Sequence, residues 1–428
     1  MMLNEKTVAA YTAILQEELL LATGCTEPIA VAYCAAKLRE VLGGKPEEVL
    51  AEVSGNILKN VKSVVVPNTD GRRGIDAAIA VGIVAGDADA ELQVIANVTE
   101  DDAAAIQGYL DATPIKVTCP VTPCLLDIFL HGKRAGHTAA VRVANNHTNI
   151  IYMERDGEVL LEKPLTANAE DNLQDKSVLN VKDIITFAET VPLDRIEPVI
   201  GRQIACNTAI AEEGLRNSWG ANIGSTLLQR SDDIETQARA WAAAGSDARM
   251  NGCALPVAIV CGSGNQGITC ALPVMEYAEY LRCDHERLVR AVMLSDLIAV
   301  HIKSYIGALS AFCGAICAAC GAGAAITWLC GGTREQIGAT VSNTLGNVGG
   351  IVCDGAKASC AAKISAAVDA AILGHDMAMQ GRGFRAGEGL IQDTVEQTIA
   401  SMGYVGRVGM KDTDVEILNI MIGKTRVC

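Results

Sequence analysis

Three cysteines in the C-terminal third of the chain have a spacing suited to an inorganic centre. Cys353 and Cys360 lie seven residues apart, in a stretch that starts at Gly349 and crosses a glycine-containing break into an alanine-rich helical run. Cys313 lies forty residues upstream of Cys353, in another run of small residues. Four cysteines usually hold an electron-transfer iron–sulfur cluster, so three would leave one iron open to a substrate. The spacing therefore predicts an open-iron cluster with a pocket above it.

Another cysteine with potential chemistry lies near the N-terminus, in the segment Gly24-Cys25-Thr26-Glu27-Pro28. Thr26 is a typical N-cap residue, and the following helix is expected to end at Gly43-Gly44. A thiol just before a helix N-terminus meets the positive end of the helix dipole, which lowers its pKa. Cys25 is therefore predicted to be a reactive thiolate, and the alternative is a buried cysteine beside the cap.

Two polar segments are candidates for binding an anion. Arg249 is the arginine of a predicted loop at 247–252, and an isolated arginine often pairs with a carboxylate. The glycine-rich segment 262–267 precedes an apolar helix, so its backbone N–H groups favour an anion, although no Gly-Lys-Ser/Thr follows as in a phosphate loop. Lys303 enters another apolar helix, as a pocket cation or a snorkelling side chain. His147 is interpreted as a turn residue.

Composition excludes several classes of protein. The formal charge of −15 argues against nucleic acid and against an anionic membrane surface. Sixteen cysteines without a visible signal peptide indicate a reducing, cytoplasmic compartment. The run 306–330 is long enough to span a bilayer, but its Gly, Ala and Cys content favours a buried helix or helix pair. Six cysteines among apolar neighbours are expected to act as small hydrophobes: Cys34, Cys206, Cys261, Cys270, Cys317 and Cys320.

A chain of 428 residues is expected to form two domains. Patterning predicts an α+β fold, with a large, mostly helical domain at 1–49 and 166–428 that carries the iron–sulfur site. A smaller mixed α+β domain is expected at 50–165, inserted near the N-terminus. Its predicted strands are 61–66, 94–98, 115–121, 139–143 and 149–153, and helices are expected at 75–84 and 101–110.

Four motifs together resemble the L-cysteine desulfidase family, which is related to the catalytic subunit of iron–sulfur L-serine dehydratases. They are the segments 24–28, 247–250, 262–267 and 350–357, and the resemblance covers essentially the whole chain. It implies a [4Fe–4S] cluster on Cys313, Cys353 and Cys360, with Cys317 and Cys320 close enough in sequence to compete for the first position. It also implies a general base at Cys25.

The resemblance implies β-elimination from a small amino acid, L-cysteine or L-serine, without pyridoxal phosphate. Cys428 resembles the C-terminal cysteine of related dehydratases, which is thought to be a reversible fourth ligand. A homodimer is expected, and a redox or iron-sensing cluster protein is the non-enzymatic alternative. Cys25 and Lys303 are assigned to catalysis. Substrate binding is assigned to Thr26, Arg249, Ser263, Gly264, Asn265 and Gln266.

Overall fold

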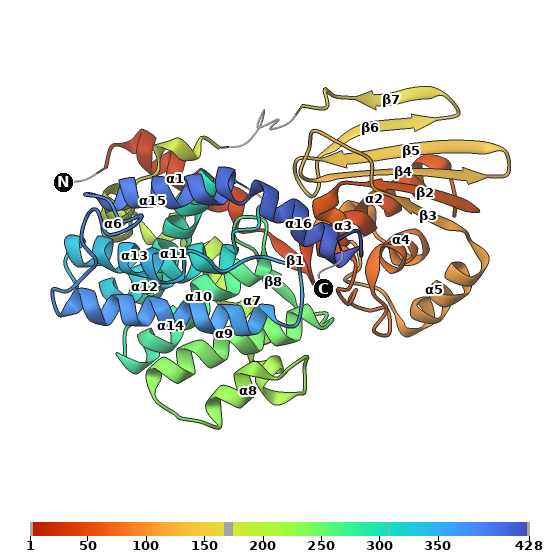
Figure 1. Cartoon of the computed structure of the whole chain (residues 1–428). Coiled ribbons are helices and arrows are strands. Elements are labelled where there is room, and N and C mark those ends of the chain that lie inside the picture. Colours follow the sequence, from red (N-terminus) through yellow and green to blue (C-terminus); the bar gives the residue numbers. More distant parts are fainter. Residues whose placement is uncertain (1–2, 167–173, 308, 426–428) are drawn as a thin grey trace.

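The computed structural model describes residues 3–166, 174–307 and 309–425, which form a large helical part beside a smaller part built on a sheet (Figure 1). The predicted α+β class is confirmed. The helical part contains the helices α1 Glu5–Glu18, α6 Val181–Thr190, α7 Glu197–Arg216, α8 Ile223–Leu228, α9 Ile234–Met250, α10 Gly264–Tyr280, α11 His285–Ile306, α12 Gly314–Leu329, α13 Arg334–Val348, α14 Cys360–Met379, α15 Val395–Tyr404 and α16 Lys411–Met421.

The sheet is six-stranded, in the order β3-β2-β4-β5-β6-β7, and only its β2–β3 pair is parallel. Its strands are β2 Glu48–Val53, β3 Ile115–Thr118, β4 Asp127–Arg134, β5 His137–Ala144, β6 Ile150–Arg155 and β7 Glu158–Glu162. The helices α2 Thr26–Leu42, α3 Gly55–Val61, α4 Gly74–Ala85 and α5 Glu100–Ala112 accompany it. Helix α2 packs on β4, β5 and α4, so its first turn lies where the sheet meets the helical part.

Two predicted strands are wrong, and others were missed. Residues 61–66 end helix α3 and form only an isolated bridge between Val65 and Arg73, while residues 94–98 form turns. The valines and isoleucine of these two segments are mostly buried, but they do not form a strand. β-Branched residues are favoured at buried positions in general, so their presence alone does not distinguish a strand from a buried turn. Strand β4 was missed because it carries charged residues; its buried Asp127 pairs with Arg142, Oδ2 to Nη2 at 2.6 Å.

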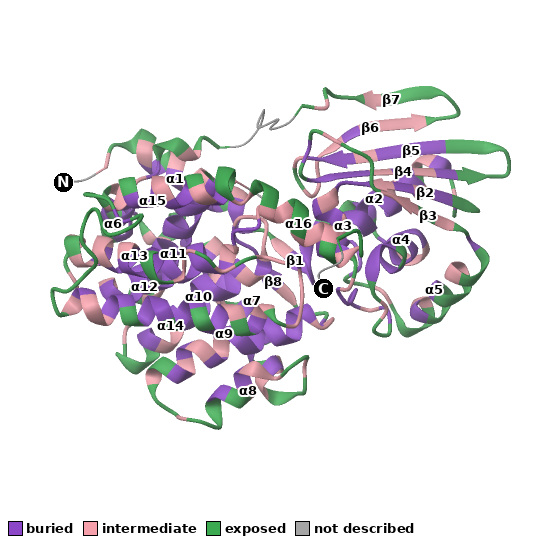
Figure 2. Cartoon of the chain, in the orientation of Figure 1, coloured by how far each residue is buried: buried purple, intermediate pink, exposed green. Residues whose placement is uncertain are grey.

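Most of the run 306–330 lies in one buried helix, α12 Gly314–Leu329, which packs against α10, α11, α13 and α14 (Figure 2). Its glycines are required because neighbouring helices approach its backbone closely. A Cβ on Gly321 would overlap the Ser295 carbonyl, and one on Gly323 would lie 3.1 Å from Thr340 Cγ2. No helix in the described part of the chain is both long and apolar enough to cross a membrane.

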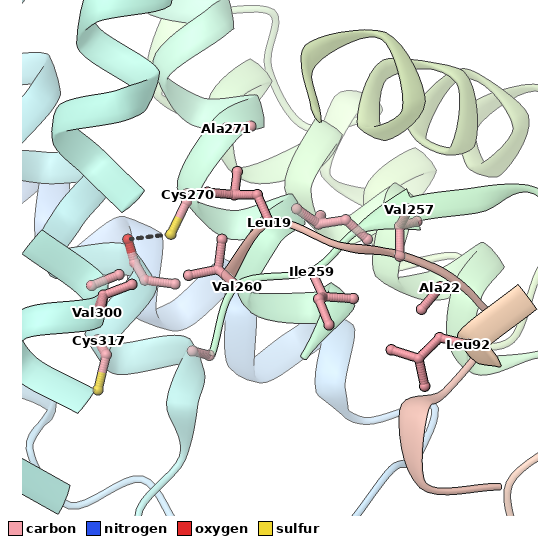
Figure 3. Close-up of a cluster of buried hydrophobic side chains, with 14 of the residues drawn as sticks. Leu19, Ala22, Leu92, Val257, Ile259, Val260, Cys270, Ala271, Val300 and Cys317 are labelled. Atoms are coloured by element: carbon pink, nitrogen blue, oxygen red, sulfur yellow. Dashed lines mark hydrogen bonds between the residues drawn. The ribbon is translucent and has the colours of Figure 1, made fainter. Parts of the chain in front are cut away.

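A two-stranded sheet, β1 Leu21–Thr23 with β8 Pro256–Ala258, joins the N-terminal segment to the helical core. Beside it, Cys270 and Cys317 are fully buried, and the Cys270 thiol lies 4.0 Å from the Ala318 carbonyl (Figure 3). Cys34 and Cys320 are also fully buried, which confirms the prediction that these four pack as small hydrophobes. Cys206 and Cys261 are only partly buried.

Candidate functional site

Cys25 lies at the start of α2, where it occupies the N-cap position itself. The prediction that Thr26 would be the cap is wrong by one residue. The Thr26 hydroxyl instead donates to the Gly262 carbonyl at 2.8 Å and so ties the start of α2 to the glycine-rich segment. This bond uses the Thr26 hydroxyl proton, and it joins the first turn of α2 to the segment 262–267.

The Cys25 thiol points at a carboxylate. Its Sγ donates to Glu27 Oε2 at 3.3 Å, and Asn60 Nδ2 donates to Glu27 Oε1 at 2.9 Å. Burial, and then the nearby Glu27 charge, raise the pKa of Cys25, whereas Arg249 opposes the rise. The sequence prediction of a lowered thiol pKa is therefore wrong, because the helix dipole is outweighed by desolvation and a neighbouring anion.

The three predicted cluster cysteines come from neighbouring elements. Cys313 is the N-cap of α12, Cys353 lies in the loop after α13, and Cys360 is the first residue of α14. Two backbone bonds align the first two segments, from Cys353 N to the Ala311 carbonyl at 2.6 Å and from Cys313 N to the Ile351 carbonyl at 3.1 Å. Burial, and then the proximity of Cys353 and Cys360, raise the pKa of Cys313. The fold thus brings three thiols into one electrostatic environment.

Thiolates are the ligands that hold iron–sulfur clusters, and these three come from adjacent segments. Within the described residues, no three His, Cys, Asp or Glu side chains lie close enough together to hold one metal ion. A cubane cluster needs a wider arrangement, because each thiolate binds a different iron. Lys363, which is paired with Asp354, offsets negative charge at Cys313 and Cys360. The donor set therefore fits a cluster held by Cys313, Cys353 and Cys360.

Arg249 presents an unused hydrogen-bonding edge inside the protein. It lies in the last turn of α9, so the predicted loop at 247–252 is largely helical, and the residue is only 2% exposed. Nη1 donates to Asn265 Oδ1 at 3.1 Å, but Nε and Nη2 are buried without a partner among the described residues. These two N–H groups form one edge of the guanidinium, the edge that binds a carboxylate with two parallel bonds.

The glycine-rich segment packs between Arg249 and the thiols. Helix α10 begins at Gly264, with Ser263 as its N-cap, so the predicted loop is shorter than expected. A Cβ on Gly314, the residue after Cys313, would lie 2.7 Å from Gln266 Cδ. Gln266 Oε1 is also buried and unpaired in the described structure. Gln266 therefore places an acceptor without a partner in the described structure beside Gly314, the neighbour of Cys313.

Gly264→Ala is expected to weaken the binding of an amino-acid carboxylate about 10- to 100-fold, because the site loses a charged hydrogen-bond pair. The new Cβ would overlap Arg249 Nε and would lie 2.7 Å from its Cζ, so the guanidinium edge must move. Titration with L-alanine, which has no leaving group, measures this loss. Gly108→Ala is the control, since its Cβ meets nothing within 4 Å. Unchanged affinity in Gly264→Ala would contradict the role of the Arg249 edge.

The structure gives no direct support for the predicted roles of Lys303 and Cys428. Lys303 is buried in the last turn of α11, and its charge opposes the burial that raises the pKa of Cys317 to about 11. Burial also raises the pKa of Cys261, the residue before the glycine-rich segment, and the Lys303 charge opposes this rise. The catalytic assignment of Lys303 stays a prediction. Cys428 lies outside the described residues.

His147 is the polar residue that sequence reasoning missed. It lies in the turn between β5 and β6, as predicted, but its ring packs on the glycine-rich segment: a Cβ on Gly262 would lie 3.1 Å from His147 Cε1. Burial lowers the pKa of His147, with Glu27 opposing the shift and Arg249 adding to it. The sequence feature that contains His147 is the polar run 145–149. Such runs are common in hairpin turns, so this one did not identify His147 as a site residue.

The fold and this group of thiols, carboxylate and guanidinium define an α+β protein with a thiol-rich polar site at the junction of its two parts. The chain belongs to the serine dehydratase alpha chain family, whose model matches residues 89–419. It is 49% identical to the UPF0597 protein of Desulfitobacterium hafniense, over 98% of both chains. It is 45% identical to that of Treponema denticola, over 99% of this chain and 100% of the relative. Membership of the family points to a lyase.

Proposed function

We propose that the chain is an iron–sulfur-dependent lyase that eliminates the β-substituent of an amino acid. L-Cysteine is the proposed substrate, with hydrogen sulfide, ammonia and pyruvate as products, and L-serine is the alternative. The observation that carries the proposal is the buried Arg249 edge, which has no partner among the described residues and lies near the Cys25–Glu27 pair, with Cys360 also close to Cys25. Such an arrangement supports a carboxylate site and a proton acceptor near one of the proposed cluster ligands.

In the proposed reaction, Arg249 Nε and Nη2 hold the substrate carboxylate and fix the α-carbon near Cys25. The Cys25 thiol loses its proton to water before the substrate binds, a loss that the Arg249 charge favours, and the resulting thiolate takes the α-proton. The Asn60 bond to Glu27 keeps this carboxylate oriented toward the thiol. An iron without a protein ligand, when the cluster is bound, supplies a Lewis acid for the leaving group. The enamine product then tautomerises and hydrolyses in water, which requires no pyridoxal phosphate.

A thiol leaving group suits this site because iron–sulfur centres favour soft sulfur ligands. The expected result is sulfide release from L-cysteine by anaerobically purified protein that contains iron and acid-labile sulfide. Pyruvate formation from L-serine, assayed in parallel, measures the alternative substrate. A cluster-containing protein that produces neither would favour the redox or sensor reading. A metal-free protein that is fully active would contradict the cluster.

The remaining expectations belong to the same proposal. We infer a cytoplasmic homodimer that needs neither nucleic acid nor a membrane, and light scattering together with fractionation would measure these properties. The proposed domains are 1–49 with 166–428, and 50–165. Helix α2 packs on the sheet of the smaller unit although it precedes residue 50. Limited proteolysis would show whether the two parts separate at these positions.

A further inference from the structure

We propose that His147 is a substrate-binding residue, which donates a hydrogen bond from Nε2 to the carboxylate held by Arg249. This inference rests on the proposed function for the identity of its ligand. It assigns a role to a residue of the β5–β6 hairpin, whereas Arg249 belongs to helix α9. The two donors would then hold one carboxylate from both parts of the molecule.

The first observation is that the imidazole ring is packed against the protein, whereas one of its nitrogens has no hydrogen-bond partner among the described residues. Its Cε1 edge lies against Gly262, whose carbonyl is anchored by Thr26. Its Nε2 is buried and has no hydrogen-bond partner within the described part of the chain. A buried polar atom usually has a partner, so an orphaned one at a functional site indicates an absent ligand.

The second observation is the charge around the ring. Glu27 and Arg249 both influence His147, and Arg249 also leaves its Nε and Nη2 edge unpaired in the described residues. A carboxylate between the imidazole and the guanidinium would satisfy three orphaned nitrogens at once. Glu27 is already engaged elsewhere, because its two oxygens accept bonds from Cys25 and Asn60.

The third observation is how the ring is held in place. His147 lies between β5 and β6, and β5 packs on α2, whose first turn carries Cys25 and Glu27. The Thr26 bond to Gly262 links that turn to the segment beneath the ring. The imidazole is therefore fixed by rigid elements on two sides, which lowers the entropy lost when a ligand binds.

Calorimetric titration with L-alanine tests the assignment, because this amino acid keeps the carboxylate and cannot be turned over. Ethylamine, which lacks the carboxylate, is the comparison ligand. His147→Ala and His147→Phe are expected to weaken L-alanine binding about 10- to 100-fold and to leave ethylamine unaffected. Phenylalanine keeps a ring on Gly262 without a donor, so it separates binding from packing. His147→Gln, which restores an N–H donor, is expected to recover part of the affinity.

His137→Ala is the matched control. It lies at the start of β5, the strand that precedes the His147 turn, is exposed, and pairs with Asp156 through Nδ1 at 2.8 Å. It should bind L-alanine as the unmodified chain does. An unchanged L-alanine affinity in folded His147→Phe would overturn the inference, even if the chain releases sulfide from L-cysteine. A chain without lyase activity whose L-alanine binding still depends on His147 would refute the proposed function and support the inference.

Discussion

Cys360→Ser is expected to abolish the iron–sulfur chromophore and the lyase activity together. Cys360 is the first residue of α14, and its thiol packs in the same small apolar group as Cys25 and Met250. Serine keeps the shape of the side chain but offers a hydroxyl, a poor ligand for iron compared with a thiolate. Iron and sulfide content, the visible absorption spectrum and sulfide release from L-cysteine, all measured anaerobically, check this expectation.

The control for Cys360→Ser is Cys330→Ser. Cys330 is the C-cap of α12, whereas Cys313 is the N-cap, so the two are separated by the 16 residues of the helix. At 1.5 Å per residue the control lies about 24 Å from the proposed cluster position. It should keep both colour and activity. A Cys360→Ser protein with a full complement of iron and normal activity would show that Cys360 is not a ligand.

Cys25→Ala is expected to lower kcat about 100- to 10,000-fold while leaving the cluster spectrum unchanged, which is the usual contribution of a positioned base. The thiol donates to Glu27, and its removal leaves the substrate α-proton without an acceptor. Cys25→Ser should do little better, because a hydroxyl is a far weaker acid than a thiol. Steady-state kinetics and the absorption spectrum of the same sample provide the measurement.

Cys34→Ala is the control on the same helix. Cys34 is fully buried and its thiol donates to the Val141 carbonyl at 3.4 Å, so its loss should cost some stability but not kcat. If Cys25→Ala instead lost the cluster, Cys25 would be an iron ligand and not a base.

The sequence predicted the fold class and several elements well, because their signals are local. Capping and glycine signals located α2, and the Ala- and Gly-rich run located α12. The strands were harder to predict. Buried valines at 61–66 belong to a helix end and a turn, and the charged strand β4 depends on a partner, Arg142, that no local pattern indicates.

The candidate site shows the same division between local and long-range information. Motif spacing led to Cys25, Arg249 and the three cluster cysteines. It did not reveal that burial raises the pKa of Cys25, or that His147 lies against Gly262. Both facts depend on contacts between distant segments. Residues 147 and 262 are joined only after the sheet docks against the helical part.

Helix α16 is tied to the site through helix α3. Asp414 of α16 pairs with the buried Lys59 of α3, and Lys62 Nζ donates to the Met421 carbonyl at 2.6 Å. Helix α3 also supplies Asn60 to Glu27, and its Lys59 carbonyl accepts from Lys357 Nζ at 3.3 Å. Elements from distant parts of the sequence thus brace one site. Detachment of α16 from α3 would therefore loosen Asn60 and, with it, the orientation of Glu27 toward Cys25.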